Sequence, residues 1–453
     1  MDVDIINPWT GSCDFAYDYM AEAEVEALLA ASARGFADWS RRTLTERADA
    51  LRQVATGLRS ERETLAALMS AEMGKLRREG LAEIEKSASA CEYYAERASD
   101  YLADTAVATE AQRSYVSYQP IGCVLAIMPW NFPIWQVFRF LAPALMAGNV
   151  ALLKHAITVP RCADAIARIV HAAGVPTGVF GVLHIDNDMA ARVIADTRIA
   201  AVSLTGSERA GRSVATTAGK HLKKCVLELG GSDAFIVLDD ADMDRAIAVA
   251  VASRFGNAGQ TCIAAKRFIV VKKALSAFTD RLTAAANGLL VGDPMQAATG
   301  LAPMARADLR DAIHAQVERS VAAGATVLAG CRLPDHPCAY PASVLAGVAP
   351  GMPAWDEELF GPVASVIAVA DDAQAVQVAN DTRFGLGASV WGVDRDRAER
   401  VARQLDVGAV FVNALVRSDV RLPFGGTKQS GYGRELAEHG IREFVNIRSV
   451  WVD

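Results

Sequence analysis

The sequence predicts an α/β protein in which two successive blocks of chain each form a largely parallel sheet. Short apolar strands alternate with helical stretches from residue 120 to 231, and a second alternating block runs from residue 233 to about 408. Near-continuous apolar strands are typical of parallel sheets that helices cover on both faces. With 52% hydrophobic residues and a net charge of −7, the chain is excluded from the disordered class.

The residues before the first block are mainly helical in pattern. Apolar positions recur every three or four residues over 23–39, 45–59 and 81–102, which predicts three amphipathic helices. Residues 113–119 alternate between two sides instead, which predicts a half-exposed strand.

Each block contributes buried strands bounded by turns. In the first block we expect strands at 122–128, 150–153, 179–183, 200–204 and 225–229, with helices at 162–173 and 209–221. In the second we expect strands at 234–238, 267–271, 363–369 and 408–412, with a helix at 243–255. Residues 444–452 form a further extended strand. Like 113–119, it lacks partners in its own block, and such strands favour a paired-strand flap and pairing between subunits.

Composition and charge narrow the possible partners. The mild acidic excess argues against nucleic acid and anionic membranes, which need clustered Lys and Arg. Eight cysteines include no CxxC pair and seven histidines form no HExxH, so no metal site is predicted. The N-terminal residues lack the pattern of a signal peptide, and we expect a cytoplasmic protein. The uncharged segment 114–138 carries three prolines, so it is interpreted as core and active site, not as a membrane span.

Two residues are candidates for covalent and acid–base chemistry. Cys262 ends the polar, glycine-containing run Asn257–Cys262, which allows close approach of a ligand, although an inert thiol is the alternative. Glu228 ends an apolar strand, where desolvation raises a carboxyl pKa toward that of a general base. A buried ion pair is the alternative for Glu228.

Two further turns contain groups that can bind anions. Asn131, between Pro129 and Pro133, carries an amide that can donate to an oxyanion, or it simply belongs to a stiff turn. Gly206 and Ser207 follow a predicted strand and open a helix, which suits either a phosphate site or an ordinary helix cap.

Seven motifs occur in a fixed order along the chain: MPWNFP, LLKHA, LTGS, LELGG, NAGQTC, EELFGPV and PFGGTKQSGYGRE. With this set the chain closely resembles the NAD(P)-dependent aldehyde dehydrogenase superfamily. Within it the chain is most similar to the short bacterial succinate-semialdehyde dehydrogenases of the Sad type, which share the MPWNFPxWQVxR and KKCVLELGGSD stretches.

The resemblance implies a fold, a mechanism and a set of site residues. The implied fold is aldehyde dehydrogenase-like: a Rossmann-like cofactor domain (1–104 and 120–231), an α/β catalytic domain (232–435) and a small β oligomerisation flap (105–119 and 436–453). Cys262 would be the nucleophile and Glu228 the general base, with Asn131 and the Cys262 N–H forming the oxyanion hole. The implied cofactor residues are Trp130, Lys154, His155, Ala156, Ile157, Gly206, Ser207, Gly211, Leu229, Glu358 and Phe360.

The resemblance also implies a substrate and a cofactor. Many NAD-preferring relatives carry Glu where this chain has Ile157, so both NAD and NADP are expected to be usable. Succinate semialdehyde is the favoured substrate, and another aliphatic or aromatic aldehyde is the alternative. Arg139 is expected to bind the distal carboxylate, with Arg421, in preference to Arg417, supplying further charge because Gly256 offers none. A homodimer or homotetramer is expected.

Overall fold

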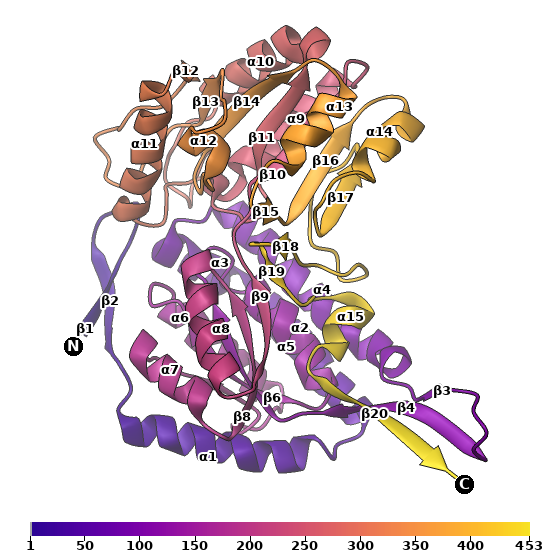
Figure 1. The fold of residues 1–453 in the computed structure, drawn as a ribbon. Coiled ribbons are helices and arrows are strands. Elements are labelled where there is room, and N and C mark those ends of the chain that lie inside the picture. The colour runs from indigo at the N-terminus through magenta and orange to yellow at the C-terminus, as the bar shows by residue number, and fades with distance from the viewer. Residues whose placement is uncertain (1) are drawn as a thin grey trace.

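Two mainly parallel sheets, one from each half of the chain, form the framework of the computed structural model, which describes residues 2–453 (Figure 1). The first sheet has the order β19-β9-β8-β5-β6-β7. Its strands are β5 (Cys123–Met128), β6 (Val150–His155), β7 (Phe180–Val182), β8 (Ile199–Thr205), β9 (Lys224–Glu228) and β19 (Gly431–Tyr432). Every pairing is parallel except that of β19 with β9, so the expected α/β architecture is confirmed for this block.

Helices pack around the first sheet and begin at recognisable signals. They are α1 (Glu22–Trp39), α2 (Leu44–Ser60), α3 (Arg62–Met73), α4 (Arg77–Tyr101), α5 (Trp135–Met146), α6 (Pro160–Ala172), α7 (Asn187–Ala195), α8 (Glu208–Lys220) and α15 (Ala437–Arg442). At α2, Thr43 and Glu46 form a reciprocal capping box, and α6 starts with Pro160, which needs no N–H partner there. These local signals explain why expected helix boundaries agree with the observed ones to within a few residues.

The second sheet has the order β12-β13-β14-β11-β10-β16-β17, and only β12 runs antiparallel to its neighbour. Its strands are β10 (Asp233–Val237), β11 (Ala265–Val271), β12 (Thr326–Ala329), β13 (Ser343–Ala346), β14 (Val363–Val369), β16 (Gly387–Trp391) and β17 (Ala409–Val412). The helices of this block are α9 (Met243–Phe255), α10 (Lys272–Asn287), α11 (Ala307–Ala322), α12 (Pro353–Asp356), α13 (Asp372–Asn380) and α14 (Arg395–Ala402), with the 3₁₀ turn η1 (Gly256–Gly259) after α9.

Alternate residues of the interior strand β10 enter different hydrophobic cores. Ala234 and Ile236 join one cluster, whereas Phe235 and Val237 join the cluster on the opposite face. Successive side chains of a strand point to opposite faces, so this sheet is covered on both sides.

The two lone strands predicted from the sequence pair with each other. In a three-stranded sheet, β4 (Arg113–Pro120) lies between β3 (Thr105–Ala106) and β20 (Val445–Val452), and β4 and β20 are antiparallel along their whole length. This sheet projects beside the C-terminus in Figure 1. Two small hairpins complete the strands: β1 (Asp2–Ile6) with β2 (Cys13–Asp18), and β15 (Phe384–Gly385) with β18 (Thr427–Lys428).

The first sheet includes one strand from a later part of the chain than expected. Gly431 of β19 pairs with Glu228, although residues 232–435 are expected to belong to the catalytic domain. A Cβ on Gly431, whose φ is +117°, would lie 1.9 Å from the Leu227 carbonyl oxygen, so only glycine fits this approach. Over residues 2–453, no helix has the length and apolar character needed to cross a membrane.

Candidate active site

A cavity of about 310 Å³ surrounds Cys262 where the two blocks meet. Three parts of the chain line it. The first is α4 with the start of α5, the second is the turn from α9 to Cys262, and the third is a loop of the C-terminal region. The charged and aromatic lining residues are Glu79, Glu83, Lys86, Phe132, Trp135, Arg139, Arg417 and Phe424. The predicted nucleophile therefore faces a partly open, mainly apolar cavity whose lining includes charged side chains.

The turn that presents Cys262 has a strained backbone, and a buried lysine holds it through hydrogen bonds. Asn257 and Ala258 both have φ of +52°, a left-handed conformation that costs energy for residues other than glycine. Lys266 Nζ donates hydrogen bonds to the carbonyl oxygens of Thr261 at 2.9 Å and Cys262 at 2.6 Å. No motif in the sequence marks Lys266, which contacts the turn only because the chain folds.

Burial raises the pKa of the Cys262 thiol to about 11, opposed in part by the positive charges of Arg139 and Lys266. The thiolate is the nucleophilic form of cysteine. At neutral pH the thiol in this arrangement is protonated, so the reaction requires its proton to be removed when the substrate binds.

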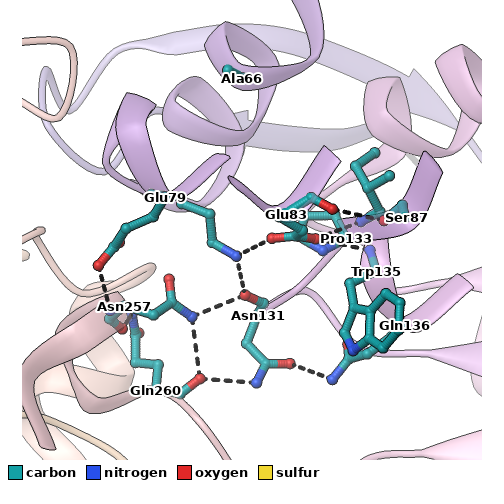
Figure 2. Close-up of polar contacts among 12 residues, drawn as sticks. Ala66, Glu79, Glu83, Ser87, Asn131, Pro133, Trp135, Gln136, Asn257 and Gln260 are labelled. Atoms are coloured by element: carbon teal, nitrogen blue, oxygen red, sulfur yellow. Dashed lines mark hydrogen bonds and ion pairs between the residues drawn. The ribbon is translucent and has the colours of Figure 1, made fainter. Parts of the chain in front are cut away.

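The side-chain amide of Asn131 is held at both its nitrogen and its oxygen, as Figure 2 shows. Its side-chain Nδ2 donates to the Gln260 carbonyl oxygen at 2.8 Å, and its Oδ1 accepts from Gln136 Nε2 at 3.2 Å. The amide carries two N–H groups, and Gln260 takes one. The orientation is therefore set by the protein, and the second N–H is the one that can donate to a ligand.

Behind Asn131 lies a buried ion pair between Lys75 and Glu83, whose side chains are 1% and 2% exposed. Lys75 Nζ also donates to the Asn131 carbonyl oxygen at 2.8 Å. Glu83 Oε1 accepts from the backbone N–H groups of Ile134 at 2.8 Å and Trp135 at 2.9 Å, at the N-terminal end of α5 (Figure 2). The pair thus joins α4 to the turn that carries Asn131. Sequence reasoning did not identify either residue.

Glu228 is buried at the end of β9, and neither of its carboxyl oxygens has a hydrogen-bond partner within residues 2–453. Burial raises its pKa well above the usual range, Arg139 opposes the shift and Glu435 adds to it. The carboxyl lies beside Gly425, where a Cβ would approach Glu228 Oε1 to 2.7 Å, and it does not line the Cys262 cavity described above. The raised pKa favours the protonated form of Glu228, which can act as a base only after losing its proton.

Arg139 lines the cavity, but its charge is already paired. The buried guanidinium forms an ion pair with Glu435, donates from Nη2 to Thr205 Oγ1 at 3.0 Å, and lies 4.7 Å from the centre of the Phe424 ring. Arg421, which the sequence favours as a source of further charge, is not among the residues that line this cavity. Its side chain is 69% exposed and paired with Asp419, away from the cavity, whereas Arg417 does line it. A short-range ion pair with a neighbour two residues away holds Arg421 at the surface.

Lys86 is a cation of this cavity that sequence reasoning missed. Its Nζ donates to Ser418 Oγ at 2.7 Å and lies 4.1 Å from the centre of the Trp135 ring. Burial, then the positive charge of Arg139, lowers the pKa of Lys86 to about 8. No sequence motif distinguishes Lys86, because a lysine on an amphipathic helix is usually a solvated side chain.

A second cavity of about 310 Å³ lies over the carboxyl ends of β6 and β8. Lys154, Ser207 and Arg209 are among its lining residues, together with apolar side chains such as Ile127 and Leu204. Ser207 Oγ accepts from the Ala210 N–H at 3.3 Å and caps α8. Two cations and a helix N-terminus at the carboxyl ends of parallel strands fit an anionic nucleotide.

The other expected cofactor residues fall into two groups. Trp130 and Phe360 approach each other from the two blocks, with ring centres 5.9 Å apart and planes at 89°. Glu358 Oε1 accepts from the Gly231 N–H at 3.1 Å and forms an ion pair with Lys266 at 3.2 Å, next to the Cys262 turn. These three residues lie between the two sheets, where a cofactor would have to reach Cys262.

The remaining expected cofactor residues have partners inside the protein. The His155 ring bridges the Ala156 N–H at 2.9 Å and the Pro133 carbonyl oxygen at 2.9 Å, and burial lowers its pKa to about 4. Gly211 faces Leu229, whose methyl groups would lie 2.7 Å from an added Cβ. The Gly206 N–H donates to the Glu228 carbonyl oxygen at 2.9 Å. The side chain of Ile157 is 40% exposed and its carbonyl oxygen accepts from the Tyr17 hydroxyl at 3.1 Å.

Comparison with known proteins identifies the same family over the whole chain. The family model described as "Aldehyde dehydrogenase family" matches residues 1–450. A Synechocystis protein named "Probable succinate-semialdehyde dehydrogenase [NADP(+)]" is 48% identical over 100% of both chains. "Succinate semialdehyde dehydrogenase [NAD(P)+] Sad" of Escherichia coli is 46% identical over 99% of this chain and 97% of its own length.

A solved structure agrees with these matches. Succinic semialdehyde dehydrogenase from Streptococcus pyogenes, in complex with NADP+, superimposes with a TM-score of 0.97 at 38% identity, covering 99% of each chain.

Proposed function

The chain belongs to the aldehyde dehydrogenase family, and from this premise we propose that it oxidises succinate semialdehyde to succinate with NAD(P)+. The observation that carries the choice of substrate is the Cys262 cavity, which contains Lys86 and Arg417 in addition to the paired Arg139. A carboxylate entering an apolar cavity without a cation would be strongly disfavoured. The named activities of the relatives from Synechocystis and Escherichia coli support the same choice.

The proposed reaction has two stages: oxidation of the aldehyde on Cys262, and hydrolysis of the resulting thioester. Cys262 Sγ forms a bond to the aldehyde carbon while the thiol proton passes to water, and the second Asn131 N–H stabilises the resulting oxyanion. NAD(P)+, when bound, accepts the hydride from that carbon, which leaves a thioester on Cys262. Water then adds to the thioester and the carbon–sulfur bond breaks, with Glu228 taking the proton of the water and the thiolate leaving. The product is the carboxylic acid.

We assign cofactor binding to the first sheet with its helices and the presentation of Cys262 to the second block. Lys154, Ser207 and Arg209 would hold the anionic and ribose part of the cofactor in the second cavity, and Glu358 with Phe360 would contact its nicotinamide end. Residue 157 carries no carboxylate that would repel a 2′-phosphate, so we propose that both NAD and NADP are used.

We also propose that the three-stranded sheet joins copies of the chain into a homodimer or homotetramer. Within residues 2–453, β20 is paired on one side only, and it exposes 62% of Ile447 and 51% of Trp451. An edge strand with exposed apolar side chains favours pairing with a second copy. Light scattering on the purified protein should give a mass that is a multiple of the monomer.

The proposed activity is tested by comparing succinic semialdehyde with butanal, which has the same carbon count and no carboxylate. Formation of NADH or NADPH is followed by absorbance with each cofactor. We expect kcat/KM at least tenfold higher for succinic semialdehyde, because a charge-assisted hydrogen bond contributes about 1.5–3 kcal/mol. Equal values for the two aldehydes would exclude the proposed substrate and favour another aliphatic or aromatic aldehyde.

A further inference from the structure

The helix α5 carries a glutamine in a segment that is buried along its whole length. Every residue from Trp135 to Met146 is buried, and Gln136 in the first turn is 2% exposed. Burying an amide costs free energy unless its donor and acceptor ends both form hydrogen bonds. Among residues 2–453, however, Gln136 Oε1 has no hydrogen-bond partner, and Nε2 donates only to Asn131 Oδ1, at 3.2 Å. A half-satisfied amide is costly for a side chain that serves packing alone.

A backbone carbonyl decides how the amides of Asn131 and Gln136 are oriented. The Gln260 carbonyl oxygen can only accept, so the atom of the Asn131 side chain that faces it at 2.8 Å is Nδ2. Asn131 Oδ1 then points to Gln136 and requires a donor, which turns Nε2 of Gln136 toward it. Figure 2 shows these contacts from Gln260 through Asn131 to Gln136. The two glutamines therefore hold the amide of Asn131 at its nitrogen and at its oxygen.

Both of these glutamines are themselves anchored. The Gln136 N–H donates to the Phe132 carbonyl oxygen at 3.2 Å, and the N–H groups of the two preceding residues donate to Glu83. Gln136 is thus fixed at a helix start that is tied to α4. On the other side, Gln260 Oε1 accepts from the Ala305 N–H at 3.0 Å. Side chains on anchored elements can hold a third group in one orientation.

Loss of the Gln136 contact would act on the side chain of Asn131 and not on its backbone. The Asn131 carbonyl oxygen accepts from Lys75 Nζ at 2.8 Å and from Asn257 Nδ2 at 2.9 Å, and neither bond involves Gln136. Without Gln136, Oδ1 becomes a buried acceptor with no partner, which favours rotation of the amide toward another donor. A rotated amide no longer aims its second N–H at the oxyanion.

We propose that Gln136 is a positioning residue for the oxidation: it orients the Asn131 amide so that the second N–H stabilises the oxyanion formed on Cys262. The inference rests on the proposed function and deepens it, because it names the group that sets the geometry of the oxyanion donor. Gln136 lines the Cys262 cavity, but it acts through Asn131 and not on the aldehyde. Donors that are already oriented need no rearrangement as charge develops, so their misorientation slows the reaction.

The test measures single-turnover formation of NADH or NADPH, with enzyme in excess over succinic semialdehyde or butanal. Gln136→Met keeps the length of the side chain and removes the amide. Complete loss of an oxyanion donor costs about 10²–10³-fold in rate, so misorientation should cost about 10- to 100-fold with both aldehydes. The steady-state KM of each aldehyde should change by less than about threefold, because the oxyanion forms only after binding.

Two comparisons assign the loss to Asn131. In an Asn131→Ala background, Gln136→Met should lower the rate by less than about threefold, because the group that Gln136 orients is absent. Alkylation of Cys262 by iodoacetamide forms a carbon–sulfur bond as iodide leaves and builds no oxyanion. Its rate in Gln136→Met should therefore equal that of the wild type.

Gln404→Met is the matched control for replacing a glutamine by methionine. Gln404 lies just after α14, is exposed, and donates to the Arg400 carbonyl oxygen at 2.9 Å. This variant should change neither the single-turnover rate nor the alkylation rate. Thermal melting of each variant detects unfolding, and if Gln136→Met does not fold, Gln136→Leu, which also lacks the amide, is measured in the same way.

Three results would overturn the inference: an unchanged single-turnover rate in Gln136→Met, an equal loss in the presence and absence of the Asn131 side chain, or alkylation of Cys262 that slows by as much as turnover. If the wild type does not distinguish succinic semialdehyde from butanal, the proposed substrate fails. The single-turnover rates with butanal still decide the role of Gln136 in that case.

Discussion

Two kinds of ionisable group lie in and near the Cys262 cavity, and they differ in whether they form an ion pair. Lys75 with Glu83 and Arg139 with Glu435 are closed ion pairs that connect helices to loops. By contrast, neither Lys86 nor Glu228 forms an ion pair within residues 2–453. Keeping an unpaired ionisable group buried costs free energy, so its presence points to a role in binding or catalysis. The paired charges instead maintain the architecture.

The largest expected effect follows from removing the unpaired carboxyl at the end of β9. Glu228→Gln should leave hydride transfer intact but slow thioester hydrolysis by about 10²–10⁴-fold. Rapid mixing should show a single-turnover burst of NADH or NADPH followed by a slow steady rate. In the wild type the hydrolysis step should accelerate as pH rises through the raised pKa of Glu228, because only the ionised form accepts a proton. A steady rate equal to that of the wild type would exclude Glu228 as the base.

Opening a closed pair should instead cost stability. Lys75→Met leaves the Glu83 carboxylate buried without its cation, which costs about 3–5 kcal/mol of unfolding free energy. Because Lys75 also holds the Asn131 carbonyl oxygen, kcat should fall for succinic semialdehyde and butanal alike. Urea denaturation measures the stability.

The double variant Lys75→Met, Glu83→Gln is the control for this pair. Removing both charges abolishes the uncompensated carboxylate, so stability should recover by more than half. If the double variant is as unstable as the single one, the loss comes from packing and not from the unpaired charge.

The unpaired lysine should make substrate preference depend on pH. A pKa of about 8 for Lys86 means that the ammonium loses its proton as pH rises through 8. The ratio of kcat/KM for succinic semialdehyde to that for butanal should therefore be flat below pH 7 and fall above pH 8, and effects of Cys262 ionisation cancel in this ratio. In Lys86→Arg the ratio should stay flat to higher pH. A wild-type ratio that does not change between pH 6 and 10 would contradict this assignment.

The three residues proposed to be catalytic could be selected from the sequence because their signals are local. A strand that ends in Glu228, a polar turn that ends in Cys262 and a proline-flanked Asn131 can each be identified along the chain. The sequence also predicts the strand 363–369 and the helix 243–255 with the boundaries that the structure shows. These elements have strong periodicity and clear end signals, such as the Asp242 cap of α9.

Contacts between distant segments were not predictable. Lys86 and Ser418 are 332 residues apart, and nothing in either neighbourhood indicates that they meet. The pairing of β19 with the first sheet was also not predictable, because a two-residue strand is too short to show a sequence pattern. The preference for Arg421 over Arg417 rests on the resemblance to the Sad-type enzymes, and the sequence does not reveal that Asp419 holds the Arg421 side chain at the surface.

The smallest expected effect comes from adding a carboxylate near the second cavity, whose charged lining residues, Lys154 and Arg209, are both cations. Ile157 follows the end of β6, three positions after Lys154, which lines the cavity. Ile157→Glu places a carboxylate near the adenine-side ribose, where it can accept hydrogen bonds from the hydroxyls of NAD and repel the 2′-phosphate of NADP. The NAD-to-NADP ratio of kcat/KM should rise about tenfold, which corresponds to about 1.4 kcal/mol. Ile157→Gln, of the same shape without the charge, should give a much smaller rise, because it can bind the hydroxyls but does not repel phosphate. If Ile157→Glu and the wild type have the same NAD-to-NADP ratio of kcat/KM, residue 157 does not face the ribose. If Ile157→Glu and Ile157→Gln raise this ratio equally, the effect comes from hydrogen bonding and not from charge.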